Sequence, residues 1–405
     1  MSDDARKSIE RPRLRPVNSK FMSGPSAKRP GYVLGALDTQ LLGRSRRTAA
    51  TTARRREVIE RSRSLLGMPS DWQLALVPGS DMGAMEMAMW SLLGPRPVDA
   101  LAYERFGHFW AADVIEQLNI PQSRLLEAPF GSLPDLAQVN WEHDVVFVWS
   151  GTTAGVRIPD ASWIPEDRGG LAICDATSAA FAMPLPWERL DVVTWSWQKA
   201  MGGEGGHGML AVSPRALSRL ETHRPAWPIP KLLRMAEGGR PIRGLFTGES
   251  VNTPSQLCVE DALDGLRWAE RIGGLPALLQ RTQANFHVIA TWVQRTPWVR
   301  LLAETPAICS PTSPCLVIDS PWYRGLDRSA QSRAAKDISA RLAGEGVAYD
   351  IDANPSAPPG LRIWCGPTIE TADLEALLPW LEWSYAQTEA LFTSSDGESQ
   401  GRPMP

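Results

Sequence analysis

The sequence predicts an α/β protein built on a mostly parallel β-sheet that is covered by helices. Two observations support this fold class. Short apolar runs alternate along the chain with stretches that have helical spacing. The apolar runs are continuous and do not alternate with polar residues, which indicates strands buried on both faces, as in a parallel sheet. The predicted strands are residues 73–78, 98–103, 145–149, 171–175 and 191–197, and the predicted helices between them include 82–93 and 110–118.

The chain divides into four predicted segments. Residues 1–20 form a polar lead-in interrupted by prolines, and residues 21–273 form the large α/β domain. A boundary is expected at Gly273 and Gly274. Residues 274–392 form a smaller α/β domain with predicted helices at 278–291, 329–344 and 371–389 and predicted strands at 315–318 and 360–364. Residues 393–405, which contain Ser, Gly and Pro, are predicted to form a flexible tail.

Composition argues against several classes of protein. The 405-residue chain has a net charge of −3. None of its apolar runs approaches the length of about 20 residues that a membrane span requires. Its five cysteines are scattered without a C-x-x-C pair, and no Cys/His spacing indicates a zinc site. We therefore expect a cytoplasmic protein in a reducing compartment, with no structural disulfide, no metal and no membrane partner.

Positive charge is concentrated in residues 43–63, GRSRRTAATTARRREVIERSR. From about Thr51 onward, the acids and arginines fall at helical spacing. This part therefore predicts the solvated face of an amphipathic helix, and no nucleic-acid partner is expected. Arg44, Arg46 and Arg47 precede that helix and need a separate explanation. Nucleic-acid binding through this segment is the alternative that the charge pattern leaves open.

Polar residues follow the ends of several predicted strands, which is where ligands bind in a parallel sheet. Asp175 ends the strand LAIC, and Lys199 follows the next strand in WSWQKAMGG. Ser80 and Asp81, in GSDMG, open a helix directly after the first strand. Backbone N–H groups and the helix dipole favour a phosphate at such a place. Taken alone, an acid there usually caps a helix and a lysine is usually solvated.

Taken together, these groups match the needs of pyridoxal 5'-phosphate. The aldehyde of this cofactor requires a lysine for a Schiff base, its ring nitrogen requires an acid that keeps it protonated, and its phosphate requires a helix N-terminus. Gly203, Gly205 and Gly208 also fit the dinucleotide pattern G-x-G-x-x-G. However, that pattern requires a helix next, and the following MLAVS indicates a strand. We interpret these glycines as a tight turn beside Lys199.

Further segments resemble the phosphoserine aminotransferase family, which belongs to the class V, fold-type I pyridoxal-phosphate enzymes. The resemblance extends over about residues 15–386. It rests on the following segments, in this order: SGPSAKRPG, LGRSRR, DMGAMEMAMWSLLG, SGTTAGVR, CDATSAAFA, SWQKAMGGE, GESVNTPS, CVEDALD and APPGLRIWCG. It implies a mostly parallel seven-stranded sheet, pyridoxal 5'-phosphate as cofactor, and a homodimer with shared active sites that acts on small amino acids and 2-oxo acids.

The resemblance implies a role for each matching residue at the cofactor. Lys199 resembles the lysine that forms the Schiff base and moves the proton between the substrate Cα and the cofactor. Asp175 resembles the acid paired with the ring nitrogen, Trp110 resembles the aromatic ring stacked on the cofactor, and Thr152 resembles the hydroxyl bonded to the phenolic oxygen. The implied phosphate ligands are Ser80, Asp81 and Gln198, together with Asn252 and Thr253 of the second subunit.

On the substrate side, Arg362 in GLRIW resembles the arginine that pairs with the substrate α-carboxylate through two nitrogens. The implied substrate ligands are Ser23, Arg46, Arg47 and Arg362. Three positions depart from the family pattern. Arg46 stands where the family has histidine, Pro355 where it has a phosphate-binding arginine, and Ser150 where asparagine is usual. Loss of one charged contact to a phosphate would weaken binding by about 1.5–3 kcal/mol.

The leading hypothesis is an aminotransferase of the phosphoserine type, which transfers the amino group of glutamate to 3-phosphohydroxypyruvate in a ping-pong cycle. The departures at Arg46 and Pro355 leave open a related aminotransferase that acts on a different acidic 2-oxo acid. A class V desulfurase or lyase would need a mobile nucleophilic cysteine. Cys309, in AICSPTSPC, has the most loop-like surroundings of the five cysteines, but the prolines beside it favour a fixed turn.

Overall fold

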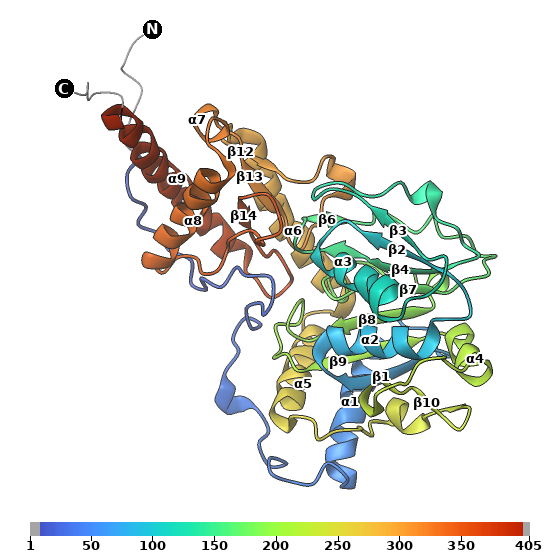
Figure 1. Cartoon of the computed structure of the whole chain (residues 1–405). Helices are drawn as coiled ribbons and strands as arrows, with labels where there is room; N and C mark the ends of the chain where they lie inside the picture. The colour runs from blue at the N-terminus through green and yellow to red at the C-terminus, as the bar shows by residue number, and fades with distance from the viewer. Residues whose placement is uncertain (1–8, 400–405) are drawn as a thin grey trace.

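The computed structural model describes residues 9–399, and the chain folds into two parts (Figure 1). The larger part contains a seven-stranded sheet with helices packed against it. The smaller part, at the upper left of Figure 1, contains a three-stranded sheet and the C-terminal helices α8 (Arg328–Gly344) and α9 (Thr371–Ser399).

The large sheet has the strand order β1-β9-β8-β7-β4-β2-β3. Neighbouring strands from β8 to β3 are parallel, whereas β9 is antiparallel to both β1 and β8. The strands are β1 (Gln73–Pro78), β2 (Val98–Ala102), β3 (Arg124–Glu127), β4 (Asp144–Val148), β7 (Ala172–Asp175), β8 (Val192–Ser196) and β9 (His207–Val212). The α/β class and the mostly parallel seven-stranded sheet are therefore confirmed.

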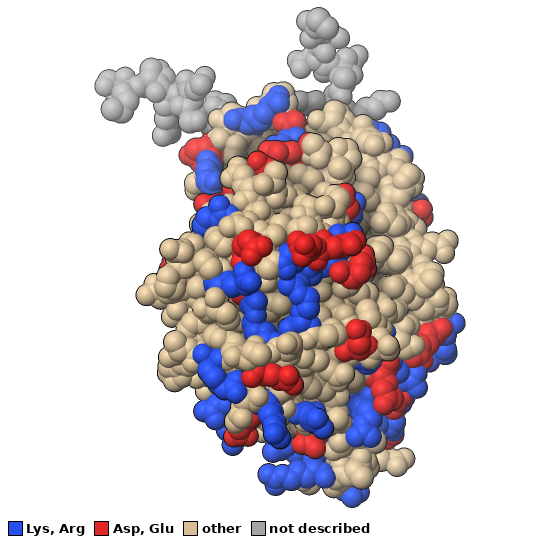
Figure 2. Space-filling view, turned by 90° about the vertical axis from the view of Figure 1, so that its right-hand side faces the viewer, with Lys and Arg blue, Asp and Glu red and all other residues tan. Residues whose placement is uncertain are grey.

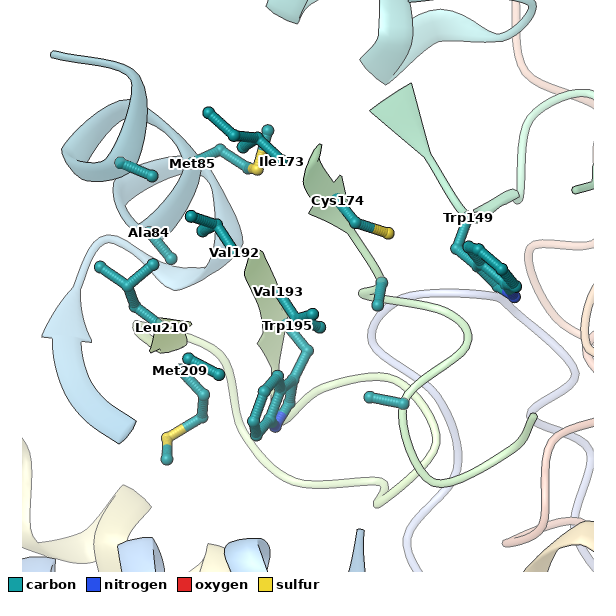
Figure 3. Packing of buried hydrophobic residues seen from close by; sticks show 14 of the residues in the cluster. Ala84, Met85, Trp149, Ile173, Cys174, Val192, Val193, Trp195, Met209 and Leu210 are labelled. Atoms are coloured by element: carbon teal, nitrogen blue, oxygen red, sulfur yellow. The ribbon is translucent and has the colours of Figure 1, made fainter. Parts of the chain in front are cut away.

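The five strands predicted in this sheet are found within one residue of their expected ends. β4 and β8, with the sequences DVVFV and VVTWS, are buried along their whole length. Branched and aromatic side chains suit a strand that is covered on both faces. Trp195 of β8 and Met209 of β9 are cross-strand partners, and they share one buried cluster with Ala84 and Met85 of α2 (Ser80–Leu92) (Figure 3).

The edge strand β3 is absent from the predicted strands. Its sequence, RLLE, is exposed at three of four positions and is charged at both ends, so it contains no apolar run. Pairing with β2 alone identifies it as a strand.

The other helices of the larger part are α1 (Ala49–Leu65), α3 (Arg105–Ala112), α4 (Pro214–Thr222) and α5 (Gln256–Arg271). The helix predicted at 110–118 begins earlier, at Arg105, so the predicted start is wrong. The Glu104 side chain caps it by accepting a hydrogen bond from the Gly107 N–H. Gly107 has low helix propensity, which conceals this first turn in the sequence. Residues Asp113–Gln117 then continue the helix as a π-helical turn.

Helix α1 occupies the basic segment as predicted, and two of its five arginines are paired with acids. Arg54 pairs with Asp38 and Glu57. Arg61 pairs with Glu57 and Glu270. Figure 2 shows one face of the molecule, on which basic and acidic side chains are interspersed. Arginines that are neutralised in this way give little support to the nucleic-acid alternative.

The smaller part is built on the antiparallel strands β12 (Val299–Leu301), β13 (Cys315–Ile318) and β14 (Leu361–Arg362). Together with α6 (Gly274–Arg295), α8 and α9, this part encloses a second buried cluster that includes Trp292, Trp364 and Trp380. The predicted strand 315–318 and helix 329–344 are confirmed, whereas the strand predicted at 360–364 covers only β14. Short additional elements are α7 (Pro321–Arg324), β5 (Ser150–Gly151) with β6 (Val156–Arg157), and β10 (Ala236–Glu237) with β11 (Arg240–Pro241).

Helix α6 connects the two parts. Leu278 near its beginning lies in the first buried cluster, and Trp292 near its end lies in the second. The domain boundary at Gly273 and Gly274 stays a prediction, because the helix that starts there contributes to both clusters.

Both ends of the described chain pack on the smaller part. The Trp380 indole donates a hydrogen bond to the Leu14 carbonyl, and the Val17 N–H donates one to the Asp373 carboxylate. At the other end, α9 continues to Ser399, so residues 393–399 are helical, and the flexibility of the predicted tail stays a prediction. Residues 393–399 contain no proline, and the Thr393 hydroxyl donates a hydrogen bond to the Glu389 carbonyl within the helix. Residues 1–8 and 400–405 of the predicted lead-in and tail lie outside the described residues.

Between residues 9 and 399, no helix is long and apolar enough to cross a membrane.

Candidate active site

A cavity of about 320 Å³ lies at the carboxyl ends of β2, β4, β7 and β8, beside the first turn of α2. This is the place where parallel sheets bind ligands. Every residue predicted to bind the cofactor from the same subunit lines this cavity: Ser80, Asp81, Trp110, Thr152, Asp175, Gln198 and Lys199.

Lys199 follows β8 and is buried with its amine in the cavity. Its Nζ donates a hydrogen bond to the Ser23 carbonyl, and the neighbouring Ser26 hydroxyl bonds to the Lys199 carbonyl. Burial, followed by the positive charge of Arg362, lowers the pKa of Lys199 to about 8. At neutral pH a larger share of this amine is therefore uncharged than in an ordinary lysine, and the uncharged form is the one that attacks a carbonyl.

Asp175, the last residue of β7, is held by two donors. Its Oδ2 accepts a hydrogen bond from the Trp110 indole at 3.1 Å, and its Oδ1 accepts one from the Thr177 N–H at 2.9 Å. Both carboxylate oxygens are therefore fixed. The hydrogen bond from the indole also fixes the orientation of the Trp110 ring. Since Trp110 is only 1% exposed, its ring is a rigid wall of the cavity.

The first turn of α2 provides an anion site. Gly79 and Ser80 have positive φ angles of 86° and 53°, which turn the chain sharply from β1 into the helix. Gly208 of β9 lies against this turn, because a Cβ atom added to it would stand 2.1 Å from the Ser80 carbonyl oxygen. The dinucleotide pattern thus includes a glycine required for packing, and the expected strand after it is confirmed as β9.

Unpaired polar atoms around the cavity indicate that it accommodates a polar ligand. Among residues 9–399, Ser196 Oγ and Gln198 Oε1 are buried without a hydrogen-bond partner, and both residues line the cavity. Buried polar atoms are rarely left unpaired in native proteins. An amine, a fixed carboxylate, an aromatic wall and a helix N-terminus fit pyridoxal 5'-phosphate, and these unpaired atoms are available to it.

Comparison with known proteins agrees with this geometry. No family model matches the chain. The phosphoserine aminotransferase of Methanosarcina mazei is 49% identical over 370 residues, which are 91% of this chain and 97% of that protein. The phosphoserine aminotransferase of Methanosarcina barkeri is 48% identical over the same shares. The chain belongs to the phosphoserine aminotransferase family. A solved structure of the phosphoserine aminotransferase from Bacillus circulans subsp. alkalophilus matches with a TM-score of 0.74 at 17% identity, covering 93% of this chain and 99% of that one, and it supports the fold.

Asp81 differs from the simple picture of a phosphate ligand in this family. Its side chain is buried in the first turn of α2, beside Asp175. Burial, followed by the charge of the nearby Asp175, raises the pKa of Asp81 well above its usual range. These effects disfavour a negative charge on the Asp81 side chain, which is the form that a bound phosphate would repel.

Ser23 and Arg362 approach the cavity from outside the large sheet. Ser23 contributes its carbonyl to Lys199, and its hydroxyl is buried without a partner among the described residues. Arg362, on β14 of the smaller part, is close enough to lower the pKa of Lys199. A carboxylate bound by Arg362 would thus lie near the amine of Lys199.

Like Ser23 and Arg362, four further predicted residues do not line the cavity of their own subunit: Arg46, Arg47, Asn252 and Thr253. Arg46 donates a hydrogen bond to the Ser250 carbonyl, so the loop before α1 is joined to the loop that contains Asn252. Arg47, Asn252 and Thr253 are exposed on this joint surface. They are therefore accessible to a second subunit.

Sequence reasoning missed Glu104, which also lines the cavity and is fully buried. It follows the end of β2 just as Lys199 follows the end of β8. The same rule of strand ends would have found it, but the helix cap that it forms is the commoner role for an acid at that position.

Cys309, the residue considered for a desulfurase, is buried. Burial raises the pKa of its thiol to about 12, so it is not a thiolate at neutral pH. Among residues 9–399, no group of His, Cys, Asp and Glu side chains could hold a metal ion.

Proposed function

We propose that this chain is a pyridoxal-phosphate-dependent aminotransferase that interconverts glutamate and 3-phosphohydroxypyruvate with 2-oxoglutarate and phosphoserine. The observation that carries the proposal is the cavity itself. Lys199 with a lowered pKa, Asp175 fixed by Trp110, and the first turn of α2 all face one space of about 320 Å³. The 49% identity to a phosphoserine aminotransferase over 91% of the chain supports the choice of substrate.

Each side chain has a distinct task in this proposal. When bound, pyridoxal 5'-phosphate supplies an electron sink that stabilises negative charge at the substrate Cα. Lys199 holds the cofactor and moves a proton to and from that Cα. Asp175 keeps the ring nitrogen protonated, and Trp110 covers one face of the ring. Thr152 binds the phenolic oxygen, whereas Ser80, the backbone of Asp81, and Gln198 bind the cofactor phosphate.

We further propose that the enzyme is a homodimer in which each subunit completes the active site of the other. Asn252 and Thr253 would contact the phosphate of the partner's cofactor. Arg46 and Arg47 would bind the substrate phosphate, while Arg362 of the first subunit binds the α-carboxylate. The exposure of Arg47, Asn252 and Thr253, away from the cavity of their own subunit, supports this arrangement.

A half-reaction tests the proposed function. Purified protein loaded with pyridoxal phosphate is mixed with glutamate or with phosphoserine, and the visible absorbance of the cofactor is followed. Both amino acids should convert the cofactor to its amino form, and Lys199→Ala should respond to neither. If glutamate reacts but phosphoserine does not, the acceptor is a different acidic 2-oxo acid, which is the alternative that Pro355 and Arg46 raise. If neither reacts, transamination is excluded.

A further inference from the structure

Glu104 is a buried acid in the cavity wall with no assigned role. It is 0% exposed and directly precedes α3, the helix that carries Trp110. A buried carboxylate is costly unless its oxygens are bonded, and a serine or threonine could cap the helix at lower cost. The presence of a glutamate here therefore calls for a second purpose.

The contacts of Glu104 connect two walls of the cavity. Its Oε1 accepts a hydrogen bond from the Gly107 N–H at 2.8 Å, in the first turn of α3. Its Oε2 accepts one from the Thr153 hydroxyl, also at 2.8 Å. The same hydroxyl accepts a hydrogen bond from the Arg105 N–H at 2.9 Å. Glu104 and Thr153 thus join the helix that carries Trp110 to the loop that carries Thr152.

Gly151 has no side chain, and this leaves room for the side chain of Glu104. A Cβ atom on Gly151 would lie 2.3 Å from Glu104 Cγ and 2.9 Å from Glu104 Cβ, and contacts this short do not occur between such atoms. Gly151 does not have a positive φ angle, so its backbone conformation does not require glycine. Space for Glu104 is the reason that this position excludes a side chain.

The charge of Glu104 acts on the reacting end of the cavity. The titratable and charged groups that face it are Tyr103, Asp175, Lys199, Cys315 and Arg362. Burial is the main cause that raises the pKa of Glu104, to about 7, while its bonds to Thr153 and Gly107 oppose this rise. Its negative form raises the pKa of Lys199, which burial and Arg362 lower.

We propose that Glu104 is a positioning residue for the cofactor, which fixes Trp110 and Thr152 relative to each other and offsets the positive charges of Lys199 and Arg362. The inference rests on one part of the proposed function, which is that pyridoxal phosphate binds in this cavity. It is independent of which 2-oxo acid the enzyme accepts.

The test compares Glu104→Ala with Glu104→Gln, which keeps the shape and can still accept a hydrogen bond from Gly107. Three quantities are measured. Titration of the apoenzyme gives the dissociation constant of pyridoxal phosphate, and the holoenzyme gives the visible circular dichroism of the bound cofactor and the pH midpoint of its visible absorbance. Asp327→Ala is the matched control, because Asp327 caps α8 through the Ala330 N–H, far from the cavity in the sequence and in the smaller part.

Glu104→Ala should weaken cofactor binding by about tenfold or more and reduce the circular dichroism signal. Glu104→Gln should bind the cofactor nearly as tightly as the wild type. The pH midpoint of its visible absorbance should move downward, because the negative charge of Glu104, which favours the protonated form of the Lys199 nitrogen, is lost. Asp327→Ala should lower only Tm. If Glu104→Ala and Glu104→Gln both match the wild type in all three quantities, Glu104 is only a helix cap and the proposal is wrong.

Two further variants cover the case in which Glu104→Ala does not fold. Thr153→Val removes both hydrogen bonds of the Thr153 hydroxyl, to Glu104 and from the Arg105 N–H, with little change in shape. Gly151→Ala displaces Glu104. Each should weaken cofactor binding and reduce the circular dichroism, and wild-type values in both would also overturn the proposal. A wild-type enzyme that binds the cofactor but does not react with phosphoserine would contradict the proposed function and leave the role of Glu104 intact.

Discussion

At the scale of single residues, the protonation of Lys199 controls how the cofactor is taken up. The pKa of its amine is lowered from 10.5 to about 8, so the amine is mostly charged below pH 8 and mostly neutral above it. Only the neutral amine attacks the aldehyde. The rate at which apoenzyme and pyridoxal phosphate develop visible absorbance should therefore rise with pH, with a midpoint near 8, and then level off. A rate that is independent of pH, or that keeps rising to pH 10.5, would contradict a buried amine with a lowered pKa.

The same shift predicts how the stability of the apoenzyme depends on pH. The folded-state pKa of Lys199 lies below its unfolded value, so the folded protein resists protonation. The free energy of unfolding of the apoenzyme should fall as the pH is lowered from about 10.5 to about 8, because the unfolded chain takes up the proton first. Lys199→Ala should lack this part of the pH dependence in urea unfolding curves.

The hydrogen bond from the Trp110 indole to Asp175 should also affect the rate of the reaction. Trp110→Phe keeps an aromatic ring but removes the N–H that donates to Oδ2. Loss of one hydrogen bond to a charged acceptor should cost about 1.5–3 kcal/mol, so kcat should fall by roughly tenfold or more, with a smaller change in KM. Trp187→Phe is the matched control, because Trp187 is also buried and donates its indole N–H to the Leu66 carbonyl, away from the cavity. Equal losses of kcat in both variants would mean that the bond to Asp175 has no special role.

The candidate residues that sequence reasoning found share one physical feature. Asp175 and Lys199 follow continuous apolar strands, and such strands end at one edge of a parallel sheet. Glu104 obeys the same rule but was missed, because an acid before a helix has a sufficient local explanation as a cap. The raised pKa of Asp81 could not be predicted from the sequence, since it depends on the burial of two carboxyl groups side by side.

At the scale of elements, the sequence predicts best where burial is continuous. The strand at β1 has its predicted bounds because QLALVP is apolar and pairs on one side with β9. β3 was missed because its exposed RLLE has no apolar pattern and only pairing with β2 defines it. The start of α3 was missed because propensity does not favour its first turn. Hydrogen bonds that the Thr153 hydroxyl and the Gly107 N–H donate to Glu104 stabilise this turn.

The close contact between β9 and the first turn of α2 makes a prediction at this scale. Gly208→Ala places a Cβ 2.1 Å from the Ser80 carbonyl oxygen, so the turn at the anion site must move. The overpacked contact should destabilise the fold by about 1–3 kcal/mol and weaken pyridoxal phosphate binding. Gly344→Ala in α8 is the control, because nothing lies within 4 Å of the added Cβ. Urea unfolding and cofactor titration measure both effects, and a Gly208→Ala protein with wild-type affinity would show that the turn tolerates displacement.

At the scale of the whole molecule, the active site lies where the two parts of the chain meet. The N-terminal segment packs on the smaller part at Phe21 and then passes Lys199 at Ser23 and Ser26 before it reaches α1. Arg362 enters from β14 of the smaller part. A change in the relative position of the two parts would therefore change the distance between Arg362 and Lys199. In the proposed function these residues bind the substrate carboxylate and the cofactor, so we expect the packing of the smaller part to affect catalysis.

The shared active site of the proposed dimer predicts complementation between inactive variants. Lys199→Ala lacks the lysine of its own cavity, and Arg47→Ala lacks the arginine that we assign to the cavity of the partner. A mixed dimer of the two has one cavity with both residues intact. After subunit exchange at equal concentrations, half of the dimers are mixed, so activity toward phosphoserine should return to about a quarter of the wild-type value. The control mixes Lys199→Ala with Asp175→Asn. Both residues line the cavity of their own chain, so each cavity of a mixed dimer lacks one of them and activity should not return. If the first mixture stays inactive under conditions in which mixed dimers are detected, Arg47 acts within its own subunit or does not bind substrate, and the shared site must be abandoned.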